Sequence, residues 1–216
     1  MMIEFTVTAP TNDLTLLSPE EQRVAAGLPS DDTSQDAALA DLEAEIVADI
    51  VSDCGITSDG VHPPTLRSEG CREVFRLQYP LRTLRLSRRH AVVVSVEEDG
   101  TMLAETAWVL EAEAGKLVRL SNDAEVCWWA SKITVVYTAG FTVVPSELKA
   151  EAKVRFKIAW SASGRDPLAR SIRTDIPDIE SRQVDYQVGG LSRLTDGLPD
   201  ESARRLRRFM TQSMVY

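Results

Sequence analysis

The chain has 216 residues, of which 44% are hydrophobic and 26% charged, proportions typical of a soluble globular protein. This length is sufficient for one well-buried core with additional segments. No apolar run reaches the roughly 18 residues that a transmembrane helix needs. The first residues, Met1–Val7, lack the basic segment that precedes the apolar part of a signal peptide. We therefore expect neither a membrane span nor a secretory leader.

Charge is distributed unevenly along the chain. Residues 1–70 contain 14 acidic and two basic residues, whereas residues 71–216 contain 19 acidic and 22 basic ones. The first part therefore carries a net charge of −12 and the second +3. This asymmetry is suited to head-to-tail contacts between copies, which close into rings or continue as filaments. An acidic surface that only keeps the protein soluble is the simpler explanation.

Two helices are predicted in the first quarter of the chain. Ser18-Pro19-Glu20-Glu21 has the pattern of a capping box with proline at the first helical position, which predicts a helix over 18–26. Asp31-Asp32-Thr33-Ser34 offers N-caps for a second helix over 31–54, which Gly55 would end. This second helix is amphipathic, with apolar residues every three or four positions at Leu39, Leu42, Ile46, Ile50 and Cys54.

From Cys71 onward the apolar pattern has a period of two, which predicts strands. We expect strands at 72–79, 82–87, 91–97, 101–110, 116–120 and 132–138. Asp99-Gly100 is a strong hairpin turn between two of them. These strands predict one antiparallel sheet or small barrel over 72–138 in an α+β protein. Pro145 then starts a long helix over 145–163, whose apolar stripe is long enough to cover one side of such a sheet.

The last fifty residues have a different character. Large apolar residues are scarce beyond Ser163, except for an alternating segment that predicts one isolated strand and a short helix that starts near Leu198. Neither element is stable alone, so we expect residues 166–216 to form an extended docking arm. The expected partner-binding residues of this arm are Val184, Tyr186, Val188, Arg204, Arg205, Leu206, Arg208, Phe209 and Met210.

Groups for catalysis or metal binding are sparse. His62 and His90 have no cysteine or second histidine at ligand spacing. Cys54, Cys71 and Cys127 are far apart and odd in number, which suits buried residues in a reducing cytoplasm. No nucleophile elbow, phosphate loop or dinucleotide fingerprint occurs. We therefore predict a protein that is not an enzyme, with no catalytic residue, no cofactor and no metal.

The order and spacing of several short segments resemble those of a known family. The segments are Ser18-Pro19-Glu20-Glu21, the acidic helix from Asp31-Asp32 to Cys54-Gly55, Pro64-Thr65-Leu66-Arg67-Ser68-Glu69, Leu84-Arg85-Leu86-Ser87-Arg88, Val94-Ser95-Val96-Glu97-Glu98-Asp99-Gly100, Val135-Val136-Tyr137-Thr138-Ala139-Gly140-Phe141 and Val144-Pro145. Together they resemble the head–tail connector (adaptor) proteins of tailed phages and gene-transfer agents over residues 14–165. Arg89-His90-Ala91 stands where such proteins usually have a proline after the Leu-Ser-Arg strand.

The resemblance implies a connector domain over 1–165, followed by the arm at 166–216. Such proteins form a ring, typically of twelve copies, under the portal of a filled capsid, where the ring extends the DNA channel and joins head to tail. The implied partners are other copies, the portal protein, and stopper or tail proteins. DNA would pass through the ring without sequence-specific binding, and no membrane is involved. The implied location is the neck of the virion, and the host cytoplasm during assembly.

Three alternatives remain open at this stage. A stopper or tail-completion protein also forms rings, but generally lacks an acidic helical pair before the sheet. A metal-dependent hydrolase would use the acidic helix, through Asp41, Glu45 and Asp49. A carbohydrate-binding domain would use Trp128 and Trp129 as a platform.

Overall fold

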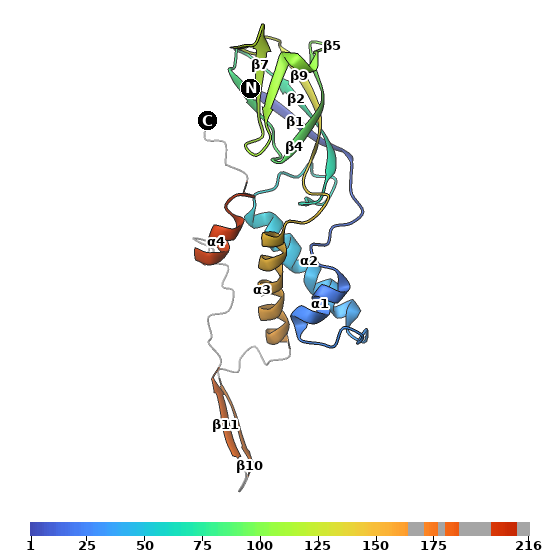
Figure 1. Cartoon of the computed structure of the whole chain (residues 1–216), viewed down its shortest axis with the longest axis vertical. Coiled ribbons are helices and arrows are strands. Elements are labelled where there is room, and N and C mark those ends of the chain that lie inside the picture. The colour runs from blue at the N-terminus through green and yellow to red at the C-terminus, as the bar shows by residue number, and fades with distance from the viewer. Residues whose placement is uncertain (164–170, 177–179, 186–199, 211–216) are drawn as a thin grey trace.

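The computed structural model describes residues 1–163, 171–176, 180–185 and 200–210. A sheet lobe contains strands β1–β9 and a helical lobe contains helices α1–α4, with the hairpin β10–β11 beyond them (Figure 1). The elements are β1 (Met2–Ala9), α1 (Pro19–Ala26), α2 (Asp36–Asp53), β2 (Glu69–Arg76), β3 (Thr83–Arg85), β4 (Ala91–Glu98), β5 (Thr101–Met102), η1 (Glu105–Ala107), β6 (Trp108–Glu111), β7 (Lys116–Ser121), β8 (Ala124–Val126), β9 (Lys132–Ala139), α3 (Ser146–Ser163), β10 (Ser171–Ile176), β11 (Glu180–Asp185) and α4 (Asp200–Leu206). The predicted α+β class is confirmed.

The sheet lobe contains two antiparallel sheets, where the sequence predicted one sheet or a small barrel. One has the strand order β1-β2-β9-β4-β5, and the other has the order β3-β7-β6 with β8 beside β7. The predicted strand over 101–110 is divided, because η1 redirects the chain from β5 in the first sheet to β6 in the second. Phe75, Val96, Leu84 and Leu117 from both sheets share one buried cluster.

β1 is a strand that the sequence analysis did not predict. It pairs antiparallel with β2, with Val7 opposite Cys71. Ile3, Phe5 and Val7 alternate with residues that are more exposed, so β1 has the period of two typical of a half-buried strand. Its pairing places β2 inside the sheet, between β1 and β9.

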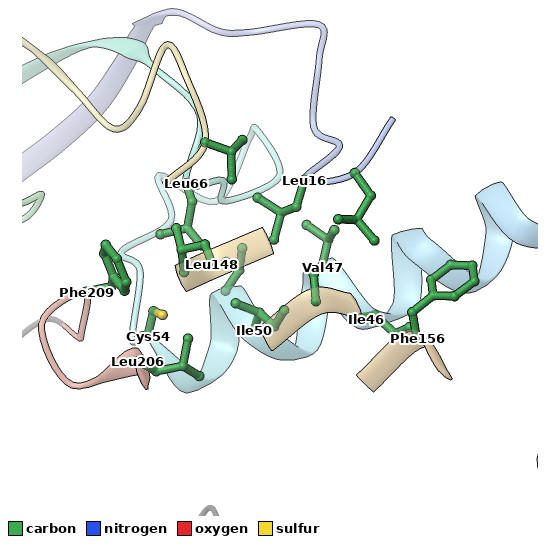
Figure 2. Packing of buried hydrophobic residues seen from close by; sticks show 14 of the residues in the cluster. Leu16, Ile46, Val47, Ile50, Cys54, Leu66, Leu148, Phe156, Leu206 and Phe209 are labelled. Carbon is green, nitrogen blue, oxygen red and sulfur yellow. The ribbon is translucent and has the colours of Figure 1, made fainter. Parts of the chain in front are cut away.

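The helical lobe has its own core, which α3 shares with α1, α2 and α4 (Figure 2). Leu148, Ala152 and Phe156 of α3 are fully buried against residues such as Ile46 and Ile50 of α2. The expectation that α3 covers a face of the sheet is therefore wrong. Its apolar stripe is matched by the apolar stripe of α2, and the two helices bury each other.

The capping box of α1 is present as predicted, with Ser18 and Glu21 each accepting from the backbone amide of the other. α2 begins at Asp36, later than the predicted residue 31. The side chain of Asp32 accepts a hydrogen bond from the amide of Ser34, which favours a turn over the first turn of a helix.

Within the described residues three segments join the lobes, and the two that follow α2 and β9 lie against each other. The turn after β9 contains Gly140 with φ of +98°, where a Cβ would collide with the carbonyl oxygen of Arg67. Phe141 donates its amide to the carbonyl of Leu66 at 2.8 Å, so this turn lies against the segment that enters β2. Nη1 of Arg88 donates to the carbonyl of Thr65 at 2.7 Å and fixes the same segment from the sheet side.

The C-terminal elements differ from the prediction of one isolated strand. β11 pairs antiparallel with β10, so the strand belongs to a hairpin. Val184 lies in β11, opposite Ile172, whereas Tyr186 and Val188 lie outside the described residues. The final helix is present as α4 and begins at Asp200, two residues later than predicted.

Candidate docking surfaces

α4 packs on the helical lobe of its own chain, and the apolar surface that receives Leu206 and Phe209 is called its seat. Leu206 and Phe209 are buried in the same cluster as Leu148 and Cys54 (Figure 2). The ring of Phe209 also meets that of Phe141 edge-on, with 5.6 Å between centroids. Full burial of a side chain of this size contributes about 1.5–3 kcal/mol. A helix of seven residues is not stable in isolation, so this apolar contact holds α4 in place.

Charged contacts surround this apolar seat. Nη2 of Arg208 lies 2.7 Å from Oε2 of Glu147, and Nη1 of Arg205 lies 3.6 Å from Oε2 of Glu151. Arg89 also donates to the carbonyl of Met210. Because Glu147 and Glu151 are one helical turn apart on α3, Arg205 of α4 and Arg208 of the turn after it follow the acidic edge of α3.

The expected partner-binding residues of the arm therefore have different environments. Leu206 and Phe209 are occupied within the chain, Arg205, Arg208 and Met210 surround them, and Arg204 is exposed. Their predicted contact with another protein stays a prediction. The sequence identified the apolar and basic faces of α4, and the finding is that its own chain provides a surface for both.

A groove of about 840 Å³ follows the outer face of α2. Small side chains form its floor, and the segments before α1 and after α2 form its sides. The floor residues include Ala40, Ala44 and Ala48, and the side residues include Leu14, Pro63 and Pro64. The sequence shows that these alanines are four residues apart. It could not predict the sides of the groove, because they come from segments without regular structure.

Glu43 supports one wall of the groove from inside. Its Oε1 accepts hydrogen bonds from the amides of Leu16 and Leu17 at 2.9 and 2.7 Å, and its Oε2 accepts from Gln22. Burial raises the pKa of Glu43, and the hydrogen bonds oppose that shift. The carboxyl group thus fixes the chain before α1 against α2.

A second apolar surface lies where α1 ends beside α3. Val24, Val154 and Ile158 expose 64%, 42% and 44% of their surfaces. Lys153 and Lys157 are on the same side of α3, and both line a hollow of about 410 Å³ with Val24 and Val154. This apolar surface is therefore bordered by basic side chains.

Ionisable groups inside the sheet lobe are enclosed. Glu73 is fully buried, and its Oε1 accepts from the hydroxyl of Tyr137 at 2.6 Å and from the amide of Ser87 at 2.7 Å. Burial raises the pKa of Glu73 and of Tyr137, so both favour the neutral form. Arg88 and Glu69 are also buried and lie 3.3 Å apart. This arrangement joins strands and offers a substrate no route to the carboxyl groups.

The remaining candidates from the sequence are the acidic metal site, the tryptophan platform and the cysteines. Within the described residues no group of three or more histidine, cysteine or acidic side chains could hold a metal ion, and no helix is long and apolar enough to cross a membrane. A platform of Trp128 and Trp129 is wrong, because Trp128 is fully buried while Trp129 is exposed. Cys54 and Cys71 are buried as expected, and Cys127 is half-buried.

The comparisons with known proteins identify the fold. No protein-family model and no curated protein matches the chain. Among solved structures, the chain is similar to one described as "Neck of empty GTA particle computed with C6 symmetry". The two have 16% sequence identity and a TM-score of 0.54, and the alignment covers 100% of this chain and 98% of that chain. At this identity the likeness establishes a shared fold.

Proposed function

We propose that this protein is a structural neck component of a tailed phage or gene-transfer agent, an adaptor that forms a ring under the portal and joins head to tail. The observation that carries the proposal is the similarity of fold over the whole chain to a chain of a GTA particle neck. The order of segments over residues 14–165 supports the same family independently of that fold comparison. The sixfold symmetry of that neck is compatible with a ring of twelve copies.

The described sites support a structural role. The fully buried acids Glu73 and Glu151 are held by neighbouring side chains of the same chain, and neither lies in an open cleft. The open concave surfaces are the α2 groove and the hollow beside α3, both lined mainly by apolar side chains. Surfaces of this kind suit contacts with proteins better than chemistry on a small substrate.

The arm is proposed to bind the portal through its hairpin and its exposed basic residues. Leu206 and Phe209 would anchor the arm to the body, because both are buried there. The hairpin β10–β11 would then present strand edges to a partner, as in β-strand addition. Val184, with Tyr186 and Val188 beyond the described residues, belongs to this proposed contact.

The neck assignment can be tested in cells that produce the particle. Removal of the gene is expected to leave filled heads and separate tails. Cryo-electron microscopy of complete particles should place the chain as a ring directly below the portal, where an adaptor lies; a ring farther along the channel would indicate a stopper. Normal joining of heads and tails without the chain would overturn the assignment.

The arm has its own test. A variant in which residues 171–185 are replaced by a Gly/Ser linker of equal length keeps α4 and its seat. It should fold with an unchanged melting temperature but fail to join heads to tails. Glu125→Ala, an exposed substitution on the sheet lobe, is the matched control and should join them normally. Normal joining by the linker variant would remove the hairpin from the proposal.

A further inference from the structure

The outer faces of α2 and α3 point away from each other. On α2, Ala44 and Ala48 are exposed, about half a helical turn from the buried Leu39 and Ile50. On α3, Val154 and Ile158 are exposed, on the side away from the buried stripe of Leu148 and Ala152. Because α2 and α3 bury their apolar stripes against one another, the two outer faces lie on opposite sides of the helical lobe.

The two faces have opposite charge. Beside the alanine floor of the groove, α2 carries exposed Asp41, Glu45 and Asp49. Beside Val154 and Ile158, α3 carries exposed Lys157 and also Lys153, whose amine already pairs with Glu21 of the same chain at 3.0 Å. α2 itself contains no lysine or arginine, so no basic side chain of that helix reduces its negative charge.

The apolar side chains of the two faces also differ in size. The groove on α2 is floored by small side chains, which allow the backbone of another helix to approach closely. The α3 face carries the exposed branched side chains of Val154 and Ile158, which are large enough to enter such a groove, with the hollow between Val154 and Val24 beside them. Lys157 precedes Ile158 and lies about 100° around α3 from it. It would then lie at the rim of the groove, where its aliphatic part covers apolar surface and its amine meets a carboxylate.

We propose that the α2 groove of one copy receives the outer face of α3 of the next copy, and that this is the contact that propagates the ring. The occupant of the groove is thus a second copy of this chain. The contact is heterologous, so each copy uses its α2 face once and its α3 face once, and repetition closes a ring. The inference deepens the proposed function and rests on it for the ring itself.

Carbodiimide cross-linking can identify this contact in the full-length protein, because the reagent joins an amine to a carboxylate only when the two are in contact. Isotopically light and heavy copies are mixed before the reaction, so that a link between copies has mixed label. The expected products join Lys157 to Asp41, Glu45 or Asp49 with mixed label, because the amine of Lys153 is paired with Glu21 of its own chain. Mixed-label products that omit α2 or α3, or a chain that gives none, would overturn the proposal.

Charge reversal provides a second measurement on the same contact. Glu45→Lys and Lys157→Glu are each expected to weaken self-association about tenfold in sedimentation experiments, because each places like charges at the interface. Both changes in one chain restore an opposite pair at every interface, so the double variant should recover to within about threefold of the unchanged protein. Glu125→Lys, exposed on β8, is the matched control and should have no effect.

Failure of this inference and failure of the neck assignment give different results. If the double variant associates no better than the single variants, the groove does not receive α3, whatever the location of the protein. If heads join tails normally without the chain, the neck assignment fails, even where the cross-links are found. Particles made with either single variant separate the two ideas directly: the expected loss of neck rings should be reversed by the double variant.

Discussion

Nη1 of Arg205 lies 3.6 Å from Oε2 of Glu151, a carboxylate that is fully buried in the middle of α3. Oε1 of the same side chain accepts from Nε of Arg155 at 2.9 Å, and Arg155 also reaches Asp53 at the end of α2. One buried acid therefore connects three helices through two arginines. The sequence alone does not indicate this connection, because Glu151 and Arg155 are four residues apart, the usual spacing of an ion pair on a helix surface.

Replacement of Glu151 by glutamine should destabilise the protein by about 1–3 kcal/mol, because the buried guanidinium of Arg155 loses one of its two charged partners and keeps only Asp53. The measurement is urea unfolding followed by fluorescence. Glu147→Gln is the control on the same helix face, since Glu147 is more exposed and pairs with exposed Arg208. It should cost less than about 0.5 kcal/mol. Equal losses for the two variants would contradict the assignment of Glu151 as a buried connection.

Leu206→Ala combined with Phe209→Ala should release α4 from its seat while the remainder stays folded. The two side chains supply the apolar contact, and α4 is too short to persist without it. Hydrogen exchange of residues 200–210 should accelerate about tenfold or more. Arg207→Ala changes an exposed residue of the same segment and should leave the exchange unchanged. Unaltered exchange in the double variant would mean that charged contacts alone hold the segment.

Acid should weaken the contact between α1 and α3 in a defined range. Burial raises the pKa of Glu21, but hydrogen bonds from Lys149, the Ser18 amide and Lys153 outweigh it and lower the pKa to about 2. Since this value is below the usual 4.5, the stabilisation is complete above pH 4.5 and is lost as pH falls toward 2. Partial solvent exposure reduces it to about 1–2 kcal/mol.

Glu21→Gln should remove that part of the acid dependence, because glutamine does not titrate and still fits the capping box. The measurement is the melting temperature between pH 5 and pH 2 for both proteins. Glu20→Gln, exposed in the same helical turn, should retain the slope of the unchanged protein. A slope that survives the change at Glu21 would assign the acid sensitivity to other carboxylates.

Gly140→Ala should be severely destabilising, by about 3 kcal/mol or more, since a Cβ would strike the carbonyl of Arg67 and the backbone has φ of +98°. Gly60→Ala is the matched control, with φ of +79° and open space around the added carbon. It carries only the conformational cost, about 1 kcal/mol. Thermal unfolding of both variants gives the comparison. Similar losses would show that the turn after β9 can move aside.

Local chemistry made much of the fold predictable. The Ser18 capping box and the Asp99-Gly100 turn act through neighbouring residues, and each is where the sequence analysis predicted it. The start of α2 was misplaced, because side chains such as Asp32 can stabilise either a cap or a turn.

Partners distant in sequence explain the errors. The stripe of α3 identified it as a packing helix but did not say whether a sheet or another helix would receive it. The division of residues 101–110 between two sheets depends on pairing with β4 on one side and β7 on the other. The role of Glu43 depends on amides 26 and 27 positions away. Contacts of this kind produce no periodic pattern in the sequence, so they could not be predicted from one sequence.

For the proposed docking surfaces, the sequence could predict the kinds of residue involved but not the surface that they form. The sequence identified the charge asymmetry and the apolar and basic faces of α4. It could not show that the arm is seated on its own chain, because the receiving surface is assembled from α2, α3 and the turn at Phe141. The groove has the same origin: its alanines are periodic, but its depth comes from flanking coil.

The turn at Asp99-Gly100 joins β4 to β5, near the end of the sheet lobe farthest from the helices (Figure 1). Gly100 has φ of +86° and no atom within 4 Å of a would-be side chain. An epitope inserted there would protrude without disturbing α2, α3 or α4. An antibody fragment bound to it would therefore mark one pole of every copy, and micrographs of labelled particles would show directly whether that pole faces the capsid or the tail.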